Sequence, residues 1–82
     1  MEQEVGEVTH YYSKLGVGII KLSDGLLVGD SIHIKGGHTD FVQAVSSLQV
    51  EYRDVGSAKK GDSVGMKVDQ KVREGDKVFK VT

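Results

Sequence analysis

Residues 27–35 read Leu-Val-Gly-Asp-Ser-Ile-His-Ile-Lys, and this stretch decides the fold. After the turn residues Gly29-Asp30 it alternates, with Ile32 and Ile34 on one face and polar residues on the other. A period of two is the pattern of a half-buried β-strand. Glycine adopts backbone angles that other residues resist, and a turn aspartate can bond to the amides that follow it. The stretch therefore predicts a tight turn that leads into a strand over 31–35.

The same glycine–aspartate pair occurs twice more, at Gly61-Asp62 and at Gly75-Asp76. Each pair precedes a predicted strand, over 64–68 and over 77–81. Three identical turns and about six strands predict a small closed antiparallel β-barrel, because closure removes the exposed edges of an open sheet. The predicted structural turn residues are Gly29, Asp30, Gly61, Asp62, Gly75 and Asp76.

The composition supports an all-β fold. The chain has 13 Val and 4 Ile against 2 Ala and 5 Leu, and side chains branched at Cβ suit a pleated surface better than a helix. Further strands are predicted over 5–13 and 17–22. The longest run without glycine, Thr39–Arg53, is also rich in strand formers. Its apolar residues change face partway along, so a β-bulge or bend is predicted at Ser46-Ser47.

The length of 82 residues indicates one domain, which we assign to residues 5–82 after a tail over 1–4. The chain lacks cysteine and lacks an apolar run long enough for a signal peptide or a membrane span, so we predict a cytoplasmic protein without membrane contact. The net charge is −1, but the basic residues concentrate after residue 58. Such a basic end is either a solvated face or a contact for phosphate.

Several segments together resemble the second domain of translational GTPases, the β-barrel module of elongation factor Tu and initiation factors. The matching segments are Gly6–Val8, Gly18–Ile20, Leu27–Ile32, Val45–Leu48, Ala58–Met66 and Val72–Val78. They cover nearly the whole chain in the order of that family. The resemblance extends to short stand-alone proteins made of this barrel alone and to barrels at the end of some collagenase-like peptidases.

The resemblance implies a binding module that contacts the ribosome, tRNA or a translation protein. In elongation factor Tu, the segment corresponding to Leu48–Arg53 presents an acidic and a basic side chain to aminoacyl-tRNA, whereas Gln49 and Tyr52 stand at those places here. This departure and the near-neutral charge favour an alternative: an accessory domain that binds a protein and works beside a separately encoded enzyme such as a collagenase-like peptidase.

Two near matches to enzyme motifs lack the required context. Residues 56–63 approach a phosphate-binding loop, but Asp62 stands where that loop needs lysine, and a strand follows instead of a helix. Residues 61–65 match the G-x-S-x-G pattern of hydrolases, yet Ser63 would open a strand and not a strand–turn–helix elbow. We therefore predict no enzyme activity, no bound nucleotide and no cofactor.

His33 and His38 flank a glycine turn close to Asp30 and Asp40, a set that could hold zinc if the loop folded back. Surface histidines are the commoner case, and His33 should face outward on its strand, so we predict no metal site.

A polar-aromatic cluster, His10-Tyr11-Tyr12, precedes the first turn. We expect one of the two tyrosines to point into the core and leave the other as a possible contact for bases or a partner. The predicted contact residues are Tyr11, Tyr12, Tyr52, Arg53, Lys59, Lys60, Lys67 and Lys71.

Overall fold

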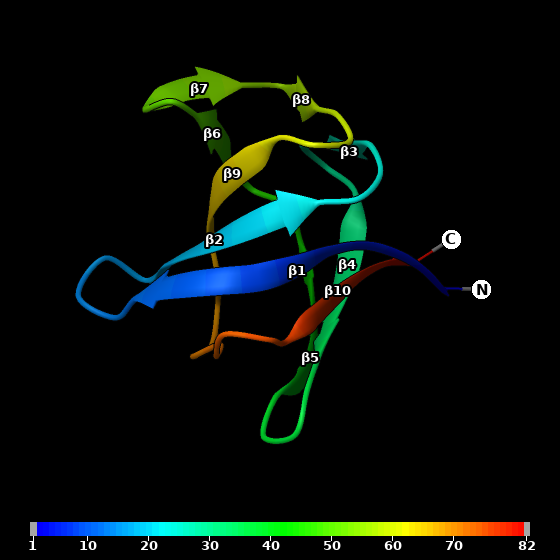
Figure 1. Cartoon of the computed structure of the whole chain (residues 1–82), viewed down its shortest axis with the longest axis vertical. Coiled ribbons are helices and arrows are strands. Elements are labelled where there is room, and N and C mark those ends of the chain that lie inside the picture. Colours follow the sequence, from blue (N-terminus) through cyan, green and yellow to red (C-terminus); the bar gives the residue numbers. More distant parts are fainter. Residues whose placement is uncertain (1, 82) are drawn as a thin grey trace.

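The computed structural model describes residues 2–81, and this part of the chain contains ten β-strands joined by turns and loops (Figure 1). They are β1 (Glu2–Tyr12), β2 (Val17–Leu22), β3 (Leu26–Leu27), β4 (Ser31–Lys35), β5 (Asp40–Ala44), β6 (Leu48–Val50), β7 (Arg53–Val55), β8 (Ser57–Ala58), β9 (Ser63–Lys67) and β10 (Lys77–Val81). The all-β antiparallel class predicted from the sequence is confirmed. Within residues 2–81, no helix is present that has the length and apolar character to cross a bilayer.

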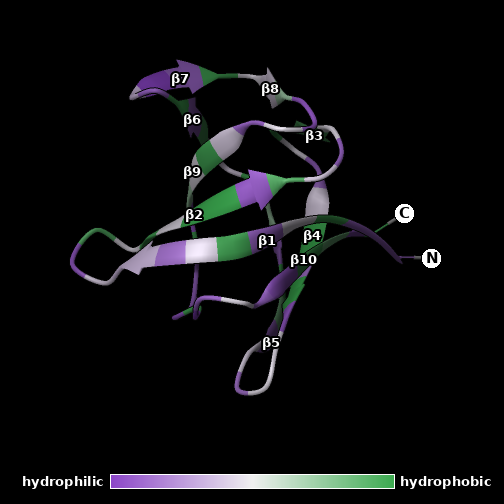
Figure 2. Ribbon diagram, in the orientation of Figure 1, coloured by the Kyte–Doolittle hydropathy of each residue, from purple (hydrophilic) through white to green (hydrophobic). Residues whose placement is uncertain are grey.

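Eight strands form one open antiparallel sheet in the order β5-β4-β10-β1-β2-β9-β6-β7, and β3 pairs with β8 in a separate two-stranded sheet. The predicted closed barrel is therefore wrong, because the edge strands β5 and β7 do not pair with each other. Both edge strands are short, and Figure 2 shows β7 as strongly hydrophilic, which suits a solvated edge. Residues 2–4, assigned to a tail in the sequence analysis, begin β1 and pair with residues 79–81 of β10.

Alternation along the strands produces a single buried core. On β2, Ile20 and Leu22 point inward, whereas Val17 and Ile19 lie on the outer face and are half-buried. The completely buried side chains come from nearly every part of the chain: Val8, Ile20, Ile32, Ile34, Val64, Met66 and Val78 have no exposed surface. Burying side chains of this size contributes roughly 1.5–3 kcal/mol each, which is the main source of stability in so small a domain.

The three glycine–aspartate pairs form three turns of the same geometry. The glycines have φ angles of 99° at Gly29, 94° at Gly61 and 93° at Gly75, a left-handed region that favours glycine. The aspartate carboxylates of Asp30, Asp62 and Asp76 accept hydrogen bonds from the amides of Leu27, Lys59 and Arg73 at 2.9, 3.1 and 2.9 Å. Each carboxylate therefore bonds to the amide three residues before it. The bonds predicted from the sequence, to the amides that follow the aspartate, are not the ones observed.

Each turn also binds a buried residue elsewhere in the chain through two backbone hydrogen bonds, and we call this arrangement a Gly-Asp clasp. The glycine amide donates to the carbonyl oxygen of the buried residue, and the amide of that residue donates to the aspartate carbonyl oxygen. The pairs are Gly29-Asp30 with Val45, Gly61-Asp62 with Leu22, and Gly75-Asp76 with Val8, with distances of 2.8–2.9 Å. The clasps fix where β4, β9 and β10 begin.

The segment predicted as one bent strand over Thr39–Arg53 contains two strands and the start of a third. The chain leaves regular pairing at residues 45–47, so the predicted interruption at Ser46-Ser47 lies where β5 ends and β6 has not begun. A second reversal at residues 51–52 was not predicted, and it joins β6 to β7. The strand number therefore exceeds the predicted six.

The side chain of Gln43 joins the edge strand β5 to the end of β9 and to the segment that follows it. Its buried side-chain amide donates to the carbonyl oxygen of Lys67 at 3.0 Å, and its carbonyl oxygen accepts from the amide of Asp69 at 2.7 Å. This pair of bonds gives partners to the backbone carbonyl of Lys67 and the backbone amide of Asp69.

Candidate functional site: a trough between two hairpins

A shallow trough crosses the outer face of β2, β9 and β6. Its floor is Gly65, which pairs with Ile19 of β2 on one side and with Gln49 of β6 on the other. Because glycine lacks a side chain, the outer face is lower here than at the neighbouring strands. A glycine inside a strand weakens the strand, and it often marks a place where a ligand or another backbone approaches closely.

Two hairpin tips form the walls of the trough. Tyr12 and Leu15 come from the β1–β2 hairpin, and Tyr52 comes from the β6–β7 turn; these hairpins reach the same side of the molecule (Figure 1). The trough has a volume of about 570 Å³. It is lined by Tyr12, Leu15, Val17, Ile19, Gln49, Glu51, Tyr52, Ser63, Val64 and Gly65.

The apolar wall residues are unusually exposed. Tyr52 is 98% exposed, Leu15 is 68% exposed and Tyr12 is 47% exposed. Contiguous exposed apolar surface on a small protein often marks an interaction site, and tyrosine is enriched at the centre of protein interfaces.

The turn that presents Tyr52 has an uncommon backbone. Glu51 and Tyr52 have φ angles of 52° and 66°, the left-handed region that two-residue hairpin turns require and that Asn-Gly normally occupies. Neither glutamate nor tyrosine favours this region, and such strain persists where the surrounding structure imposes it, often at functional sites. Nothing in the packing of the fully exposed Tyr52 ring explains why a tyrosine occupies this place.

The charge of the trough is weakly acidic. Among its lining residues, all of which lie in the described part of the chain, Glu51 is the one with a charged side chain. Lys21 and Lys67 lie on the same outer face beyond the ends of the trough, opposite Ser63 and Val17, and the Lys21 amine donates to the carbonyl oxygen of Gly61 at 3.0 Å. A surface that binds phosphate needs several basic groups that converge, and this lining supplies none.

The trough brings together two of the eight predicted contact residues, Tyr12 and Tyr52. Tyr11 is half-buried and packs against the core, as expected for one of the paired tyrosines, while the Tyr12 ring meets the His10 ring edge-on at 4.4 Å. The predicted basic contacts lie elsewhere: they are Arg53 on β7, Lys59 and Lys60 in a clasp turn, Lys67 on β9 and Lys71 in the β9–β10 loop. They do not line the trough.

Sequence reasoning missed Leu15, Ile19 and Gly65 as members of one surface. The available signals were a leucine placed in a turn and a glycine placed in the middle of an alternating strand. Recognising them as one site required the knowledge that β6 lies beside β9.

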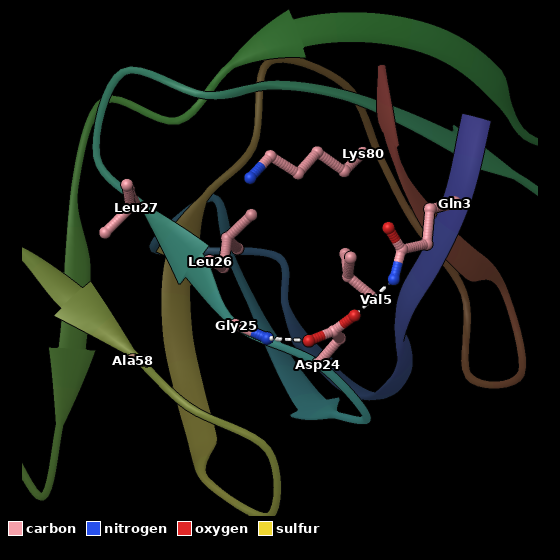
Figure 3. A pocket seen from close by; sticks show the side chains of 8 residues that line it. All are labelled: Gln3, Val5, Asp24, Gly25, Leu26, Leu27, Ala58 and Lys80. Atoms are coloured by element: carbon pink, nitrogen blue, oxygen red, sulfur yellow. Dashed lines mark hydrogen bonds between the residues drawn. The ribbon is translucent and has the colours of Figure 1, made fainter. Parts of the chain in front are cut away.

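A second hollow, shown in Figure 3, lies over Val5 and Leu26 and has a volume of about 400 Å³. Its polar side chains already bond to the protein. Gln3 donates to Asp24, the Asp24 carboxylate also accepts from the amide of Gly25 at 2.8 Å, and the amine of Lys80 lies 3.4 Å from the carboxylate of Asp30. The hollow offers fewer free groups to a partner than the trough does.

His33 bonds to two carboxylates and not to His38. Its Nδ1 lies 2.5 Å from an oxygen of Glu2, and its Nε2 contacts Asp40, so three strands meet at this side chain. The hydrogen bonds to Asp40 and Glu2 raise the pKa of His33 above the ordinary 6.5, and the bond to His33 lowers the pKa of Asp40 below the ordinary 3.8. Among residues 2–81, no group of three or more metal-binding side chains is placed to hold a metal ion.

This cluster predicts a dependence of stability on pH. The raised pKa of His33 stabilises the fold at pH values below the pKa of this histidine in the unfolded chain, and the stabilisation is lost as the pH rises through its pKa in the folded state. The lowered pKa of Asp40 stabilises the fold above about pH 4. We expect His33→Gln to reduce the free energy of unfolding more at about pH 5.5 than at about pH 9. Urea unfolding at both pH values measures this, and His38→Gln, at an exposed turn position, is the control. An equal loss at both pH values would contradict the assignment.

The residues of the two near matches to enzyme motifs lie in a turn and in the strand that follows it. Residues 59–62 form a clasp turn, and Ser63 begins β9 with its side chain on the outer face. The Lys59 amide donates to the Asp62 carboxylate and the Gly61 amide donates to the carbonyl oxygen of Leu22, so neither amide is free to bind a phosphate.

Comparison with solved structures identifies the fold. The C-terminal domain of a putative U32 peptidase from Geobacillus thermoleovorans matches with a TM-score of 0.92 at 18% identity, and the match covers 98% of this chain and 93% of that chain. The selenomethionine variant of the same domain matches with a TM-score of 0.89. The chain therefore shares the fold of that C-terminal domain.

Comparison with curated proteins gives relatives with protease names. An uncharacterised protease of Methanocaldococcus jannaschii is 44% identical over 77 residues, which are 93% of this chain and 19% of that protein. A collagenase of Porphyromonas gingivalis is 36% identical over 78 residues, which are 22% of that protein. The chain thus spans about a fifth of the length of these relatives. No family model matches the chain.

These findings overturn the expected membership of the translation factor second-domain family. The homologous proteins are a protease and collagenases, and the matching fold belongs to a peptidase, so neither the translation-factor type of barrel nor RNA binding is supported. Contacts with the ribosome or tRNA are likewise unsupported, and similarity to a peptidase C-terminal domain instead fits a module associated with a protease.

Proposed function

We propose that this chain is a non-catalytic protein-binding module that works beside a collagenase-like peptidase. The observation that supports this most is the 44% identity of nearly the whole chain to one segment of a protease of which it spans only 19%. The remaining four-fifths of such a relative is large enough to contain a catalytic domain.

The arrangement of side chains in residues 2–81 agrees with a binding role. Both near matches to enzyme motifs fall in a turn and a strand whose backbone groups are used by the fold. The trough, by contrast, exposes much of Tyr12, Leu15 and Tyr52. Exposed tyrosine and leucine around a hollow are typical of a surface that binds protein.

A direct binding measurement tests the proposal. The purified chain is titrated into the purified collagenase-like peptidase of the same organism by calorimetry, and bulk tRNA serves as the comparison. We expect saturable binding to the peptidase and none to tRNA. Binding to tRNA that weakens steeply with salt, without binding to the peptidase, would refute the proposal.

A further inference from the structure

We infer that the Asp24-Gly25 pair is a site of spontaneous modification, at which the folded chain converts aspartate to isoaspartate through a cyclic succinimide. This inference goes beyond the proposed function and does not depend on it. Three features of the described residues lead to it: the residue that follows Asp24, the hydrogen bonds of the Asp24 carboxylate and the open space at Gly25.

Asp24 is the one aspartate of the sequence that is followed by glycine. The chain has seven aspartates and no asparagine. A residue with a Cβ follows each of the other six aspartates: Ser31, Phe41, Val55, Ser63, Gln70 and Lys77. Ring closure requires the amide nitrogen of the following residue to approach the carboxyl carbon closely, and glycine leaves room for such an approach. The sequence thus singles out one position for this reaction.

The carboxylate of Asp24 bonds to the amide that would attack it. The Gly25 amide donates to Oδ1 of Asp24 at 2.8 Å, so its nitrogen is in contact with the carboxyl group of the preceding residue. The other oxygen, Oδ2, accepts a hydrogen bond from the side-chain amide of Gln3 on β1 (Figure 3). The two bonds hold the carboxyl group beside its own main-chain amide. A reaction between groups already held together avoids much of the entropy cost of bringing them into position.

The other aspartates with hydrogen-bonded carboxylates bond elsewhere. In the Gly-Asp clasps, each carboxylate accepts from the amide three residues before it. Asp40 bonds to the His33 ring, and Asp54 accepts from the side-chain amide of Gln49. Within residues 2–81, Asp24 is therefore the one aspartate whose carboxylate bonds to the amide of the next residue.

The backbone at Gly25 can move toward the carboxyl carbon. Asp24 and Gly25 lie in the bend between β2 and β3, and the pairing of β3 with β8 begins at Leu26. An added Cβ at Gly25 would meet a single atom within 4 Å, the carbonyl oxygen of Ala58 at 3.7 Å. The Gly25 nitrogen can thus leave its hydrogen bond without opening a sheet or displacing a side chain.

The reaction balances with water as its co-reactant. The Gly25 nitrogen loses its proton to solvent and forms a bond with Cγ of Asp24, while one carboxyl oxygen takes up two protons from solvent and leaves as water. A water molecule then adds to the main-chain carbonyl carbon of Asp24 and breaks its bond to the Gly25 nitrogen. The product is isoaspartate, which has the mass of aspartate but a main chain that runs through Cγ. This change lengthens the link between β2 and β3 and removes the carboxylate from its bonds with Gln3 and Gly25.

Warm incubation of the purified folded chain, followed by tryptic peptide mapping, tests the inference. The peptide over residues 22–35 contains Asp24 and, as an internal control, Asp30. We expect a second peptide of equal mass to accumulate, with isoaspartate at position 24 and not at position 30, and a minor form that is lighter by one water. A synthetic unfolded peptide of residues 22–28 is the reference, and the folded chain should convert at least as fast, because the fold holds the reacting groups in contact.

Gly25→Ala is the matched variant. Its Cβ would lie at an ordinary contact distance and the φ angle of Gly25 is not positive, so the variant should fold as the natural chain does, which circular dichroism checks. The added methyl group hinders ring closure, and conversion at Asp24 should be about tenfold slower. Gly37→Ala, at an open position away from Asp24, is the control and should convert at the natural rate.

Three results would overturn the inference. They are conversion of Asp24 about tenfold slower in the folded chain than in the unfolded peptide, conversion of Asp30 as fast as that of Asp24, and an unchanged rate in Gly25→Ala. Binding of the chain to the peptidase bears on none of them, so this inference and the proposed function stand or fall separately.

Discussion

Replacing Gln43 with leucine should lower the free energy of unfolding by about 2–4 kcal/mol, because two partly buried backbone groups lose their partners, each at a cost of roughly 1–3 kcal/mol, and the packing around the buried side chain is disturbed. The Gln43 side chain is 6% exposed and bonds to the carbonyl oxygen of Lys67 and the amide of Asp69. Leucine is similar in size but bonds to neither. A domain of this length has a total stability on the order of 5 kcal/mol, so the variant should retain only about 1–3 kcal/mol and unfold at a much lower temperature.

Thermal unfolding followed by circular dichroism measures this loss, and a domain of this size loses about 4–8 °C in Tm per kcal/mol. Gln70→Leu, at an exposed loop position, is the matched control and should change Tm little. Gln43→Glu separates the two bonds. Its carboxylate still accepts from Asp69 but faces the Lys67 carbonyl oxygen, so this variant should be more stable in mild acid, where the carboxyl is protonated. A Tm of Gln43→Leu equal to that of the natural chain would show that the bridge contributes nothing.

Gly36→Ala should be strongly destabilising. A Cβ at Gly36 would lie 1.9 Å from Oδ1 of Asp76 and 2.7 Å from its Cγ. The Asp76 side chain cannot move aside freely, because it is 4% exposed and its Oδ2 accepts from the amide of Arg73 at 2.9 Å. Relieving the overlap breaks a buried hydrogen bond to a charged group, which costs about 1.5–3 kcal/mol, and it disturbs the clasp that holds β10.

The neighbouring glycine supplies the control for this prediction. A Cβ at Gly37 would meet nothing within 4 Å, and its φ angle is not positive, so Gly37→Ala should be neutral or slightly stabilising. In an Asp76→Ala background the overlap disappears, and Gly36→Ala should then cost little more than Gly37→Ala. Urea unfolding of the four variants gives this coupling. Equal stability of Gly36→Ala and Gly37→Ala in the natural background would refute the proposed overlap.

Local signals in the sequence predicted the elements better than they predicted how the elements assemble. The three glycine–aspartate turns and the alternation of Ile32 and Ile34 were readable because their causes lie within a few residues. Closure of the sheet was not readable, since it depends on whether the edge strands β5 and β7 meet. The reversal at Glu51-Tyr52 was missed because its residues are not those that normally adopt left-handed angles.

The candidate site was predicted only in part for a related reason. Tyr12 and Tyr52 drew attention as exposed aromatic residues, but the basic residues grouped with them share only their position late in the sequence. Charge along a chain does not specify a surface, because alternate residues of a strand face opposite sides. The sequence pattern that indicated a translation factor did not determine function, because one kind of fold can serve several functions.

The three Gly-Asp clasps are nested along the chain. The clasp of residues 29–30 with Val45 lies inside that of Leu22 with residues 61–62, which lies inside that of Val8 with residues 75–76. Closing a loop costs less entropy when the chain between its ends is already shortened, so an order from the centre of the sequence outward is the least costly route to the native state. Pairing of the terminal strands β1 and β10 would then come last, and a chain still lacking its final residues could already hold its inner two clasps during synthesis.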